Sequence, residues 1–570
     1  MSNPYETRFW RKNWDPNVSD IDPKEFETTY PDMVRKIFDK YPDVMALAYQ
    51  GLEISFGEVD KYSNQFANML IENGFKKGDV VGINLANIPE YVYSVVGTLK
   101  AGCIVSGVSP LMSDVQMHYQ LDDLGKGGKN VALVTLDAIF EHRLKKIVDR
   151  LPQLKVVVAT SVIGSFDKES REKIKAVQEI PSGEVTPIEG KIVYDFQDDV
   201  LTKFSIDLPK VDITPDDIGW IQYTGGTTGP PKGAMLNHRN CVSNMKLIMA
   251  WLQWEEADGV LLSGFPMFHI AGLTVCESAI ALGWSQILIA NPRDALHICN
   301  EMKKYEPTVL VNVPSLYQIL INFRKFKRLD HSKIRMCISA ASPFPKESQI
   351  ALEGIVGEGK LLELYGMTEL SPVATMNPSI GKKQLGTVGL PIQNVELKLV
   401  DPDSGAVVPV GEPGEICARG PLVMKGYYLK PEETAKAIDK DGYMHSGDVG
   451  IMAEDGYLRI VDRTKDMIIV GGFKVFSAKV EDTLAKHPAI GMIALIGEPN
   501  PERPGSEIVS AFIQIDPDYQ YDGNEEKLTE EILSFAKENC APYEVPKKVH
   551  IMKEIPLTAV GKIDKKVLRK

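Results

Sequence analysis

The sequence contains little cysteine, and the cysteines it has are scattered. All seven lie far apart, none of them in a C-x-x-C pair, and their number is odd. A disulfide framework or a zinc ribbon requires closely spaced cysteines, so neither is expected to organise this chain. We expect reduced, mostly buried thiols and a cytoplasmic protein.

Excess positive charge is also missing. The chain has 64 lysine and arginine residues against 77 aspartate and glutamate residues, giving a net charge of −13. Non-specific binding to nucleic acid or to anionic lipid needs a basic surface. We therefore expect no nucleic-acid partner, whereas peripheral contact with a membrane is left open, as is the oligomeric state.

No apolar run is long enough to cross a membrane, which takes about 20 residues. The most apolar stretch, residues 259–290, is interrupted by His269, Glu277 and several glycines. The N-terminal residues lack the apolar core of a signal peptide. We predict a buried α/β segment at 259–290 and no transmembrane helix.

What the sequence does contain is an alternation of helix and strand signals, in a chain too long for one domain. Ser55 and Glu58 form a capping box before an amphipathic helix that ends at Gly74. Pro89 begins another helix. Apolar strands are expected at 80–85, 103–108, 131–136, 156–159, 309–313 and 336–339. This alternation predicts largely parallel sheets covered on both faces.

The pattern changes toward the C-terminus. Residues 386–461 contain short β-prone runs separated by turn signals, which predicts a small antiparallel sheet or barrel. The alternation then resumes with a core of its own. We predict an α/β protein with a large N-terminal domain, residues 1–464, and a small α+β C-terminal domain, residues 465–570. Two parallel-sheet subdomains and the β-barrel-like part make up the first.

The strongest chemical signal is the glycine- and threonine-rich loop from Tyr223 to Gly233, which follows an apolar run. Glycines let backbone amides approach an anion, hydroxyls add donors and Lys232 adds charge, so the loop can hold a polyphosphate. It is not a P-loop, because the required spacing is absent and two prolines precede Lys232. Taken alone, it could equally be a flexible surface turn.

This loop resembles the phosphate loop of the AMP-forming acyl-CoA synthetase superfamily, which also holds luciferases and peptide-synthetase adenylation domains. Matching blocks recur in order over residues 25–570, and the fatty-acyl-CoA ligase branch is the most similar. The resemblance implies an acid–thiol ligase that uses ATP, Mg²⁺ and coenzyme A. It would form an acyl-adenylate with release of pyrophosphate and then transfer the acyl group to coenzyme A, while a mobile C-terminal domain turns between the two steps.

The second block is Tyr365-Gly-Met-Thr-Glu369. By resemblance, Tyr365 packs on adenine, Thr368 contacts the α-phosphate and Glu369 holds Mg²⁺. Asp448 would bind both ribose hydroxyls, with Arg463 as its ribose or phosphate partner. The remaining nucleotide residues implied are Thr224, Gly225, Gly226, Thr227, Thr228, Gly229 and Lys232 of the loop, Gly366, and Ala340, Ala341 and Ser342 on the other wall of the adenine slot.

Five further residues carry roles implied by the resemblance. Lys562 would bridge the substrate carboxylate and the α-phosphate, although a lysine in a basic tail is also typical of a solvated surface. His269 matches a histidine beside the acyl and pantetheine tunnels, although such a histidine is often a core residue. Lys465 matches the hinge of the C-terminal domain. Gly471 and Gly472 match the glycines along the pantetheine arm, although a glycine pair also suits a hairpin turn. The implied catalytic residues are Lys562, Thr368, Glu369 and His269.

The sequence constrains the identity of the acid substrate less than it constrains the nucleotide. Acetate-specific relatives close the pocket with a tryptophan where this sequence has Gly366, so we expect a deeper pocket for a medium- or long-chain fatty acid. An alicyclic or aromatic acid is the alternative. The predicted wall residues are His269, Val311, Val313, Met367, Gly389 and Leu390.

Three rival functions were weighed. An amino-acid-adenylating enzyme is disfavoured because Ile-Ala-Gly follows His269 where an aspartate is common. A luciferase-type oxygenase would be a rare specialisation. An inactive binding paralogue is disfavoured because the acidic and basic site residues are all retained. One departure from the family, Ser477-Ala-Lys479 in place of a usual Pro-x-Glu, leaves the packing of the C-terminal domain open.

Overall fold

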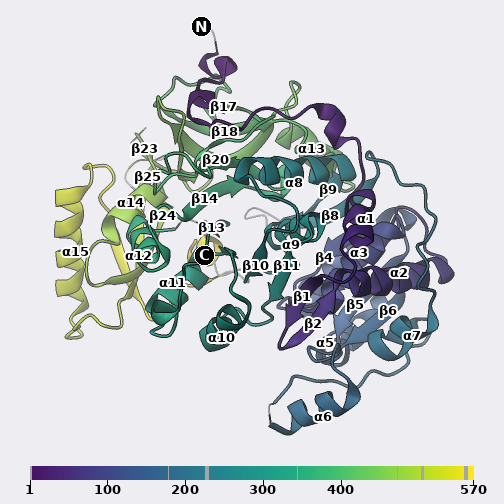
Figure 1. Ribbon diagram of the computed structural model, residues 1–570. Helices are drawn as coiled ribbons and strands as arrows, with labels where there is room; N and C mark the ends of the chain where they lie inside the picture. Colours follow the sequence, from purple (N-terminus) through teal and green to yellow (C-terminus); the bar gives the residue numbers. More distant parts are fainter. Residues whose placement is uncertain are drawn as a thin grey trace.

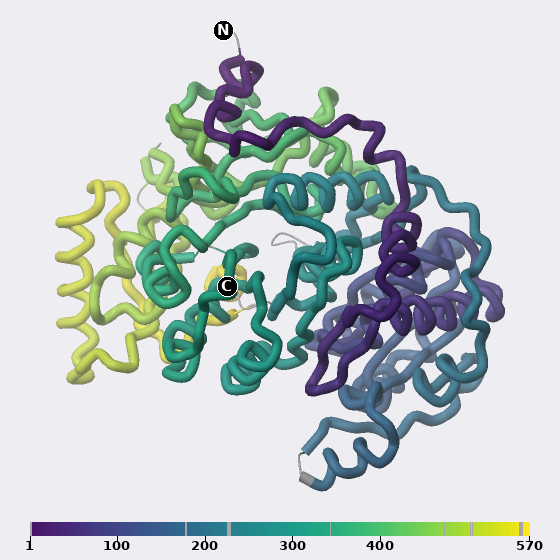
Figure 2. Tube along the Cα trace, viewed as in Figure 1, coloured from purple at the N-terminus to yellow at the C-terminus, as the bar shows by residue number. Residues whose placement is uncertain are grey.

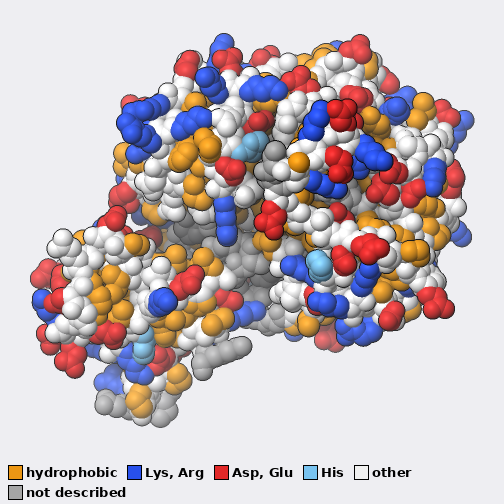
Figure 3. Space-filling model, turned by 90° about the horizontal axis from the view of Figure 1, so that it is seen from below, with side chains coloured by type: hydrophobic (Ala, Val, Ile, Leu, Met, Phe, Trp, Pro, Cys, Tyr) orange, Lys and Arg blue, Asp and Glu red, His pale blue; other side chains and the backbone are white. Residues whose placement is uncertain are grey.

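The computed structural model describes residues 3–177, 179–224, 230–342, 344–471, 473–501, 503, 506–557 and 563–569. A large N-terminal body is joined to a smaller C-terminal lobe, which lies at the left in Figures 1 and 2. On the described part of the face in Figure 3, acidic and basic side chains are interspersed, so this face offers no extended basic surface for nucleic acid.

Two mostly parallel sheets form the N-terminal body. The first has the order β16-β15-β14-β13-β12-β10-β11-β1-β2 and the second has the order β19-β9-β8-β4-β3-β5-β6-β7. The strands of the first are β1 (Met45–Tyr49), β2 (Leu52–Ser55), β10 (Val260–Ser263), β11 (Ser285–Leu288), β12 (Val309–Asn312), β13 (Met336–Ser339), β14 (Leu361–Gly366), β15 (Val373–Met376) and β16 (Leu390–Pro391). Those of the second are β3 (Val80–Asn84), β4 (Ile104–Gly107), β5 (Val131–Leu136), β6 (Leu154–Thr160), β7 (Ile192–Asp195), β8 (Ile218–Thr224), β9 (Lys232–Asn237) and β19 (Gly426–Tyr427).

Helices lie between the sheets and over their outer faces. Between the sheets, and sharing one hydrophobic core with both, are α1 (Tyr30–Lys40), α2 (Phe56–Glu72), α3 (Pro89–Lys100), α8 (His238–Leu252) and α9 (Ile270–Leu282). Over the outer faces lie α4 (Asp114–Gly125) and α5 (Asp137–His142) on one side and α10 (Ala295–Tyr305), α11 (Pro314–Asn322) and α12 (Lys346–Val356) on the other. Burial on both faces explains why the strands read as continuous apolar runs.

The local signals in the sequence are confirmed. Ser55 and Glu58 form the predicted capping box of α2, and Pro89 occupies the first turn of α3. The stretch at 259–290 becomes β10, α9 and β11, with α9 buried on nearly every side. None of the described helices is both long and apolar enough to span a bilayer. All seven cysteines are free thiols, and six are buried.

The small β-rich part is a four-stranded antiparallel sheet of order β17-β18-β20-β21, so the sheet alternative is the one observed. Its strands are β17 (Glu396–Val400), β18 (Pro413–Arg419), β20 (Met444–Met452) and β21 (Leu458–Arg463), and α13 (Pro431–Ala437) precedes β20.

The C-terminal lobe has its own hydrophobic core. It contains a hairpin of β22 (Ile468–Val470) and β23 (Phe473–Val475), a sheet of β24 (Ile490–Pro499), β25 (Glu507–Ile515) and β26 (Lys548–Met552), and the helices α14 (Ser477–Leu484), α15 (Glu525–Asn539) and α16 (Lys565–Leu568). A domain boundary between residues 464 and 465 stays a prediction.

Candidate active site

Several of the predicted nucleotide residues lie at the carboxyl ends of strands in the two large sheets, where open α/β sheets bind ligands. Thr224 ends β8, and Gly366 ends β14. Ala340, Ala341 and Ser342 directly follow β13, which pairs with β14. The loop residues Gly225, Gly226, Thr227, Thr228 and Gly229 fall outside the described residues.

Three polar residues from different strands lie in contact: Tyr365 of β14, Asp448 of β20 and Arg463 of β21. The Tyr365 hydroxyl donates to Asp448 Oδ2 at 2.8 Å, and Arg463 Nε lies 3.1 Å from Asp448 Oδ1. Burial, together with the Asp448 charge, raises the pKa of Tyr365 well above its usual value. The carboxylate expected to bind the ribose is therefore fixed beside the ring expected to pack on adenine.

A second cluster surrounds the lysine of the phosphate loop. Lys232 Nζ lies 3.2 Å from Glu433 Oε2 and 4.3 Å above the Tyr427 ring. The Tyr427 hydroxyl donates to Glu369 Oε1 at 2.6 Å. Burial raises the pKa of Glu369 by more than the Tyr427 hydrogen bond and the Lys232 charge lower it. A carboxylate oxygen is the type of ligand that Mg²⁺ takes, so Glu369 fits the ion predicted for it.

The wall formed by Ala340–Ser342 requires small side chains. Ala341 has φ +76°, in the left-handed region that larger side chains rarely adopt. At Gly366 a Cβ would lie 1.9 Å from the Pro372 carbonyl oxygen, so glycine is required by the backbone itself. Ala341 and Gly366 both line one cavity.

This cavity of about 80 Å³ runs between the sheets and is lined almost entirely by apolar side chains. Its walls come from α8 and α9 and from the ends of β12, β13 and β14. The lining residues are Ile248, Leu252, Trp254, Phe265, His269, Ile270, Ala271, Thr274, Val275, Ser278, Val311, Ile338, Ala340, Ala341, Leu364, Gly366, Met367, Pro372, Val373 and Met376. Such a cavity suits an apolar chain whose polar end meets the nucleotide residues.

Of the predicted wall residues, His269, Val311 and Met367 line this cavity, whereas Val313, Gly389 and Leu390 do not. Leu390 is fully buried on β16, opposite Met376 of β15, and it is Met376 that reaches the cavity. A Cβ at Gly389 would lie 2.0 Å from the Met376 carbonyl carbon, which shows how closely this turn packs behind β15. Gly389 and Leu390 therefore support the wall from one strand away.

His269 is placed by the start of a helix. It is the N-cap of α9, and its Nδ1 accepts a hydrogen bond from the Ala271 backbone N–H at 3.3 Å. This bond satisfies one free N–H group at the helix end, which is the ordinary role of an N-cap side chain. The ring also lines the cavity, so the capping role and a place in the cavity wall coexist.

Lys465 lies two residues after the end of β21. Burial and the neighbouring Arg463 lower its pKa to about 8. Gly471 lies in the β22–β23 hairpin turn with φ +58°, so the turn role is observed, while a pantetheine role stays a prediction. Gly472 and Lys562 fall outside the described residues.

The replacement of the family's usual Pro-x-Glu by Ser477-Ala-Lys479 has a structural consequence at Ser477. Its Oγ donates to Asp462 Oδ1 at 3.0 Å and accepts from Lys565 Nζ at 2.7 Å, and its backbone N–H also bonds Asp462. Lys565 lies 2.7 Å from Glu481 Oε1 as well. The polar side chain thus links the end of β21, helix α14 and the segment just after Lys562.

Sequence reasoning missed several of these residues. Tyr427, which joins Lys232 to Glu369, lies 58 residues from Glu369 in the chain, and no local pattern relates them. Ile248 and Leu252 have the spacing of any buried helix face, so nothing in the sequence separates cavity walls from solid core.

The fold and the site define a two-part α/β nucleotide-binding enzyme, and comparison with known proteins gives its family. The chain belongs to the AMP-binding enzyme family, which matches residues 34–428, and the AMP-binding enzyme C-terminal domain matches residues 479–562.

The relatives resemble the chain over nearly its whole length. Long-chain-fatty-acid–CoA ligase of Escherichia coli O157:H7 is 33% identical, covering 99% of this chain and 98% of the relative. The enzyme of the same name from Bacillus subtilis is 35% identical, covering 92% and 91%. The solved structure of the anthranilate CoA ligase AuaEII in complex with anthranoyl-AMP superposes with a TM-score of 0.81 at 25% identity, covering 96% and 98%.

Proposed function

We propose that this protein is an ATP-dependent, AMP-forming acid–CoA ligase whose substrate is a medium- or long-chain fatty acid. The acid's carboxylate attacks the α-phosphorus of ATP and expels pyrophosphate, which gives an acyl-adenylate. The thiol of coenzyme A then attacks the acyl carbon, releasing AMP and the thioester. Because carboxylate and ATP are both anions, positioning and charge neutralisation supply most of the catalysis.

One observation carries this proposal: the apolar cavity is lined by Gly366, which directly follows Tyr365 of the Tyr365–Asp448–Arg463 cluster. An acid whose chain fills the cavity would bring its carboxylate to the residues that suit a nucleotide. The names of the two bacterial relatives, both long-chain-fatty-acid–CoA ligases, favour a fatty acid.

The roles of individual residues belong to the proposal. Lys232 and the rest of the loop hold the phosphates, Thr368 contacts the α-phosphate, Glu369 holds Mg²⁺ and Lys562 neutralises charge between carboxylate and phosphate. The metal, when bound, offsets negative charge on the phosphates. Lys465 serves as the hinge, and we place the enzyme in the cytoplasm.

An aromatic or alicyclic acid is the second candidate. It is supported by the similarity to the solved structure of an anthranilate CoA ligase. The apolar lining does not by itself separate a flat ring from a flexible chain, because each relies on the same hydrophobic transfer energy.

Release of pyrophosphate across a panel of acids tests the proposal. The panel comprises acetate, butyrate, the even-numbered acids from hexanoate to hexadecanoate, benzoate and cyclohexanecarboxylate, each with and without coenzyme A. We expect the highest kcat/KM among the longer fatty acids, a broad optimum and little response to acetate, because an apolar pocket distinguishes one methylene by only about 1–3 kcal/mol. A preference for benzoate would favour the second candidate, and no response to any acid would refute both.

A further inference from the structure

The pairing of strand β20 with β18 shifts register next to Asp448. Between the pairs Glu415–Val449 and Cys417–His445, β20 advances four residues while β18 advances two. Three residues of β20, Ser446 to Asp448, thus lie opposite the single residue Ile416 of β18 and form a bulge in which Gly447 has φ +71°. Bulges re-aim side chains, and this one turns Asp448 toward Tyr365 and Arg463.

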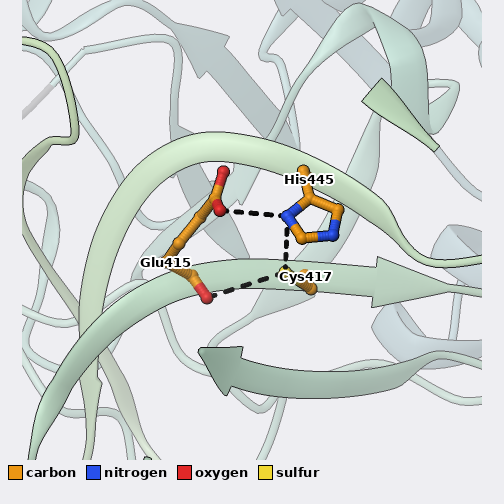
Figure 4. Close-up of side chains that lie close together, drawn as sticks. All are labelled: Glu415, Cys417 and His445. Atoms are coloured by element: carbon orange, nitrogen blue, oxygen red, sulfur yellow. Dashed lines mark hydrogen bonds and ion pairs between the residues drawn. The ribbon is translucent and has the colours of Figure 1, made fainter. Parts of the chain in front are cut away.

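The bulge is held on both sides at Gly447. Its carbonyl oxygen accepts from the Thr464 backbone N–H at 2.9 Å, and its own N–H donates to Glu415 Oε1 at 3.0 Å. The other Glu415 oxygen lies 3.0 Å from His445 Nδ1, at the far end of the same bulge (Figure 4). One half-buried carboxylate therefore bonds the bulge at two points.

His445 is itself fixed. Its Nε2 lies 3.6 Å from Asp439 Oδ2, and Asp439 accepts from Lys398 Nζ at 3.4 Å. The histidine ring is thus held between Glu415 on β18 and Asp439 in the turn before β20. It cannot rotate without losing one of these contacts.

We propose that Glu415 is a positioning residue for the nucleotide: together with His445 it forms a clasp that holds the bulge and so orients the Asp448 carboxylate toward the ribose. The inference rests on the proposed ribose role of Asp448. Without the Glu415 bond, Gly447 is free to turn about its flexible backbone, and the carboxylate that follows it shifts with the peptide.

The same three side chains could instead hold a metal ion. Glu415, Cys417 and His445 offer ligand atoms within 4.8 Å of one another, and Cys417 Sγ lies 3.4 Å from His445 Nδ1. A zinc ion would take these ligand types. The hydrogen-bonded clasp is favoured because Nδ1 already bonds Glu415, and because burial beside the Glu415 charge raises the pKa of Cys417, which keeps the thiol protonated.

Selectivity for the ribose hydroxyls tests the clasp. The measured quantity is the ratio of KM for 2′,3′-dideoxyATP to KM for ATP, with thermal unfolding recorded for every variant. Glu415→Ala should lower this ratio by about tenfold, the order expected when a charge-assisted hydrogen bond to a hydroxyl is lost. Glu415→Gln should keep the ratio, because an amide oxygen can still accept from Gly447 while its NH₂ group donates to His445.

Two further variants sharpen the result. His445→Leu, a smaller perturbation of the clasp, should lower the ratio by less than Glu415→Ala and serves if the latter does not fold. Cys417→Ser should leave the ratio unchanged. If Cys417→Ser lowers the ratio as much as Glu415→Ala does, and elemental analysis finds one zinc per wild-type chain, the three side chains form a metal site and not the clasp.

The clasp is refuted if Glu415→Ala and His445→Leu, both folded, keep the wild-type ratio while Asp448→Asn loses it. A wild type that does not distinguish the two nucleotides would instead refute the ribose role of Asp448, and the clasp with it. A merely structural effect would lower the melting temperature without changing the ratio.

Discussion

The hydroxyl of Tyr365 donates a hydrogen bond to Asp448 across 2.8 Å, although 83 residues separate them in the chain. The other carboxylate oxygen, Asp448 Oδ1, lies 3.1 Å from Arg463 Nε. Both carboxylate oxygens are therefore oriented before any nucleotide arrives, which lowers the cost of ordering the site on binding.

Tyr365→Phe removes one of these two contacts and keeps the ring. We expect KM for ATP to rise about fivefold, since a hydrogen bond contributes about 1 kcal/mol, while kcat changes little. Steady-state kinetics at saturating acid and coenzyme A measure both. Tyr49→Phe is the matched control, because that hydroxyl donates to the Val162 carbonyl at 2.7 Å in another part of the structure. An equal rise in both variants would contradict the prediction.

Glu369→Gln tests the proposed metal ligand. The amide still accepts from Tyr427, so the melting temperature should hold, but the loss of charge should weaken Mg²⁺ binding. We expect kcat to fall about a hundredfold or more and the Mg²⁺ concentration for half-maximal rate to rise. Glu433→Gln also alters a Lys232 contact, but at an exposed carboxylate, and should have a small effect. Unchanged Mg²⁺ dependence in Glu369→Gln would count against the assignment.

The two half-reactions should be separable. Lys562→Ala should abolish acid-dependent ATP–pyrophosphate exchange yet still convert supplied acyl-AMP and coenzyme A to thioester. Lys465→Pro should do the reverse, because a hinge needs freedom of φ that proline removes. Both variants are assayed in both half-reactions. If each variant lost both activities equally while folded, a single arrangement of the C-terminal domain would serve both steps.

Filling the cavity should shorten the preferred acid. Val275 lines the cavity on α9, six residues and therefore about 9 Å of helix rise beyond His269. Val275→Phe should lower kcat/KM for hexadecanoate at least tenfold more than for octanoate, because only the longer chain reaches the new ring. Val275→Ala is the control and should spare the longer acid. Equal losses for both acids in Val275→Phe would place the chain elsewhere.

Glu277 links stability to pH. Burial raises its pKa from 4.5 to about 8, although a hydrogen bond from Trp220 Nε1 at 2.9 Å acts to lower the pKa. The Glu277 carboxyl loses its proton near pH 4.5 in the unfolded chain and near pH 8 in the folded chain. The contribution of the protonated carboxyl to stability is therefore fully present below pH 4.5 and is lost as the pH rises from 4.5 to 8. Glu277→Gln should therefore show a smaller drop in melting temperature between pH 5 and pH 8 than the wild type.

The exposed Glu358→Gln is the control for this titration and should keep the wild-type slope. Some slope should remain in Glu277→Gln, because burial also raises the pKa of Glu363 to about 8. Identical pH dependence in the wild type and Glu277→Gln would show that Glu277 is already ionised in the folded protein at low pH.

The sequence by itself determined the local elements and the identity of the motifs. The Ser55–Glu58 capping box, Pro89 in the first turn of α3 and the apolar strands depend on neighbours within a few residues, and such short-range physics is legible in one chain. The glycine- and threonine-rich loop and the Tyr365–Glu369 block were likewise evident, because their chemistry lies in residue types at short spacing.

Only the tertiary structure decided which distant residues meet. Tyr427 joins Lys232 to Glu369, Glu415 bonds the peptide before Asp448, and Met376 rather than Leu390 reaches the cavity. Each contact depends on strand order, register or a two-residue surplus in one strand, and these are set by packing across the whole core rather than by local pattern. The sequence therefore indicated candidate reacting groups, and the fold determined how they are held.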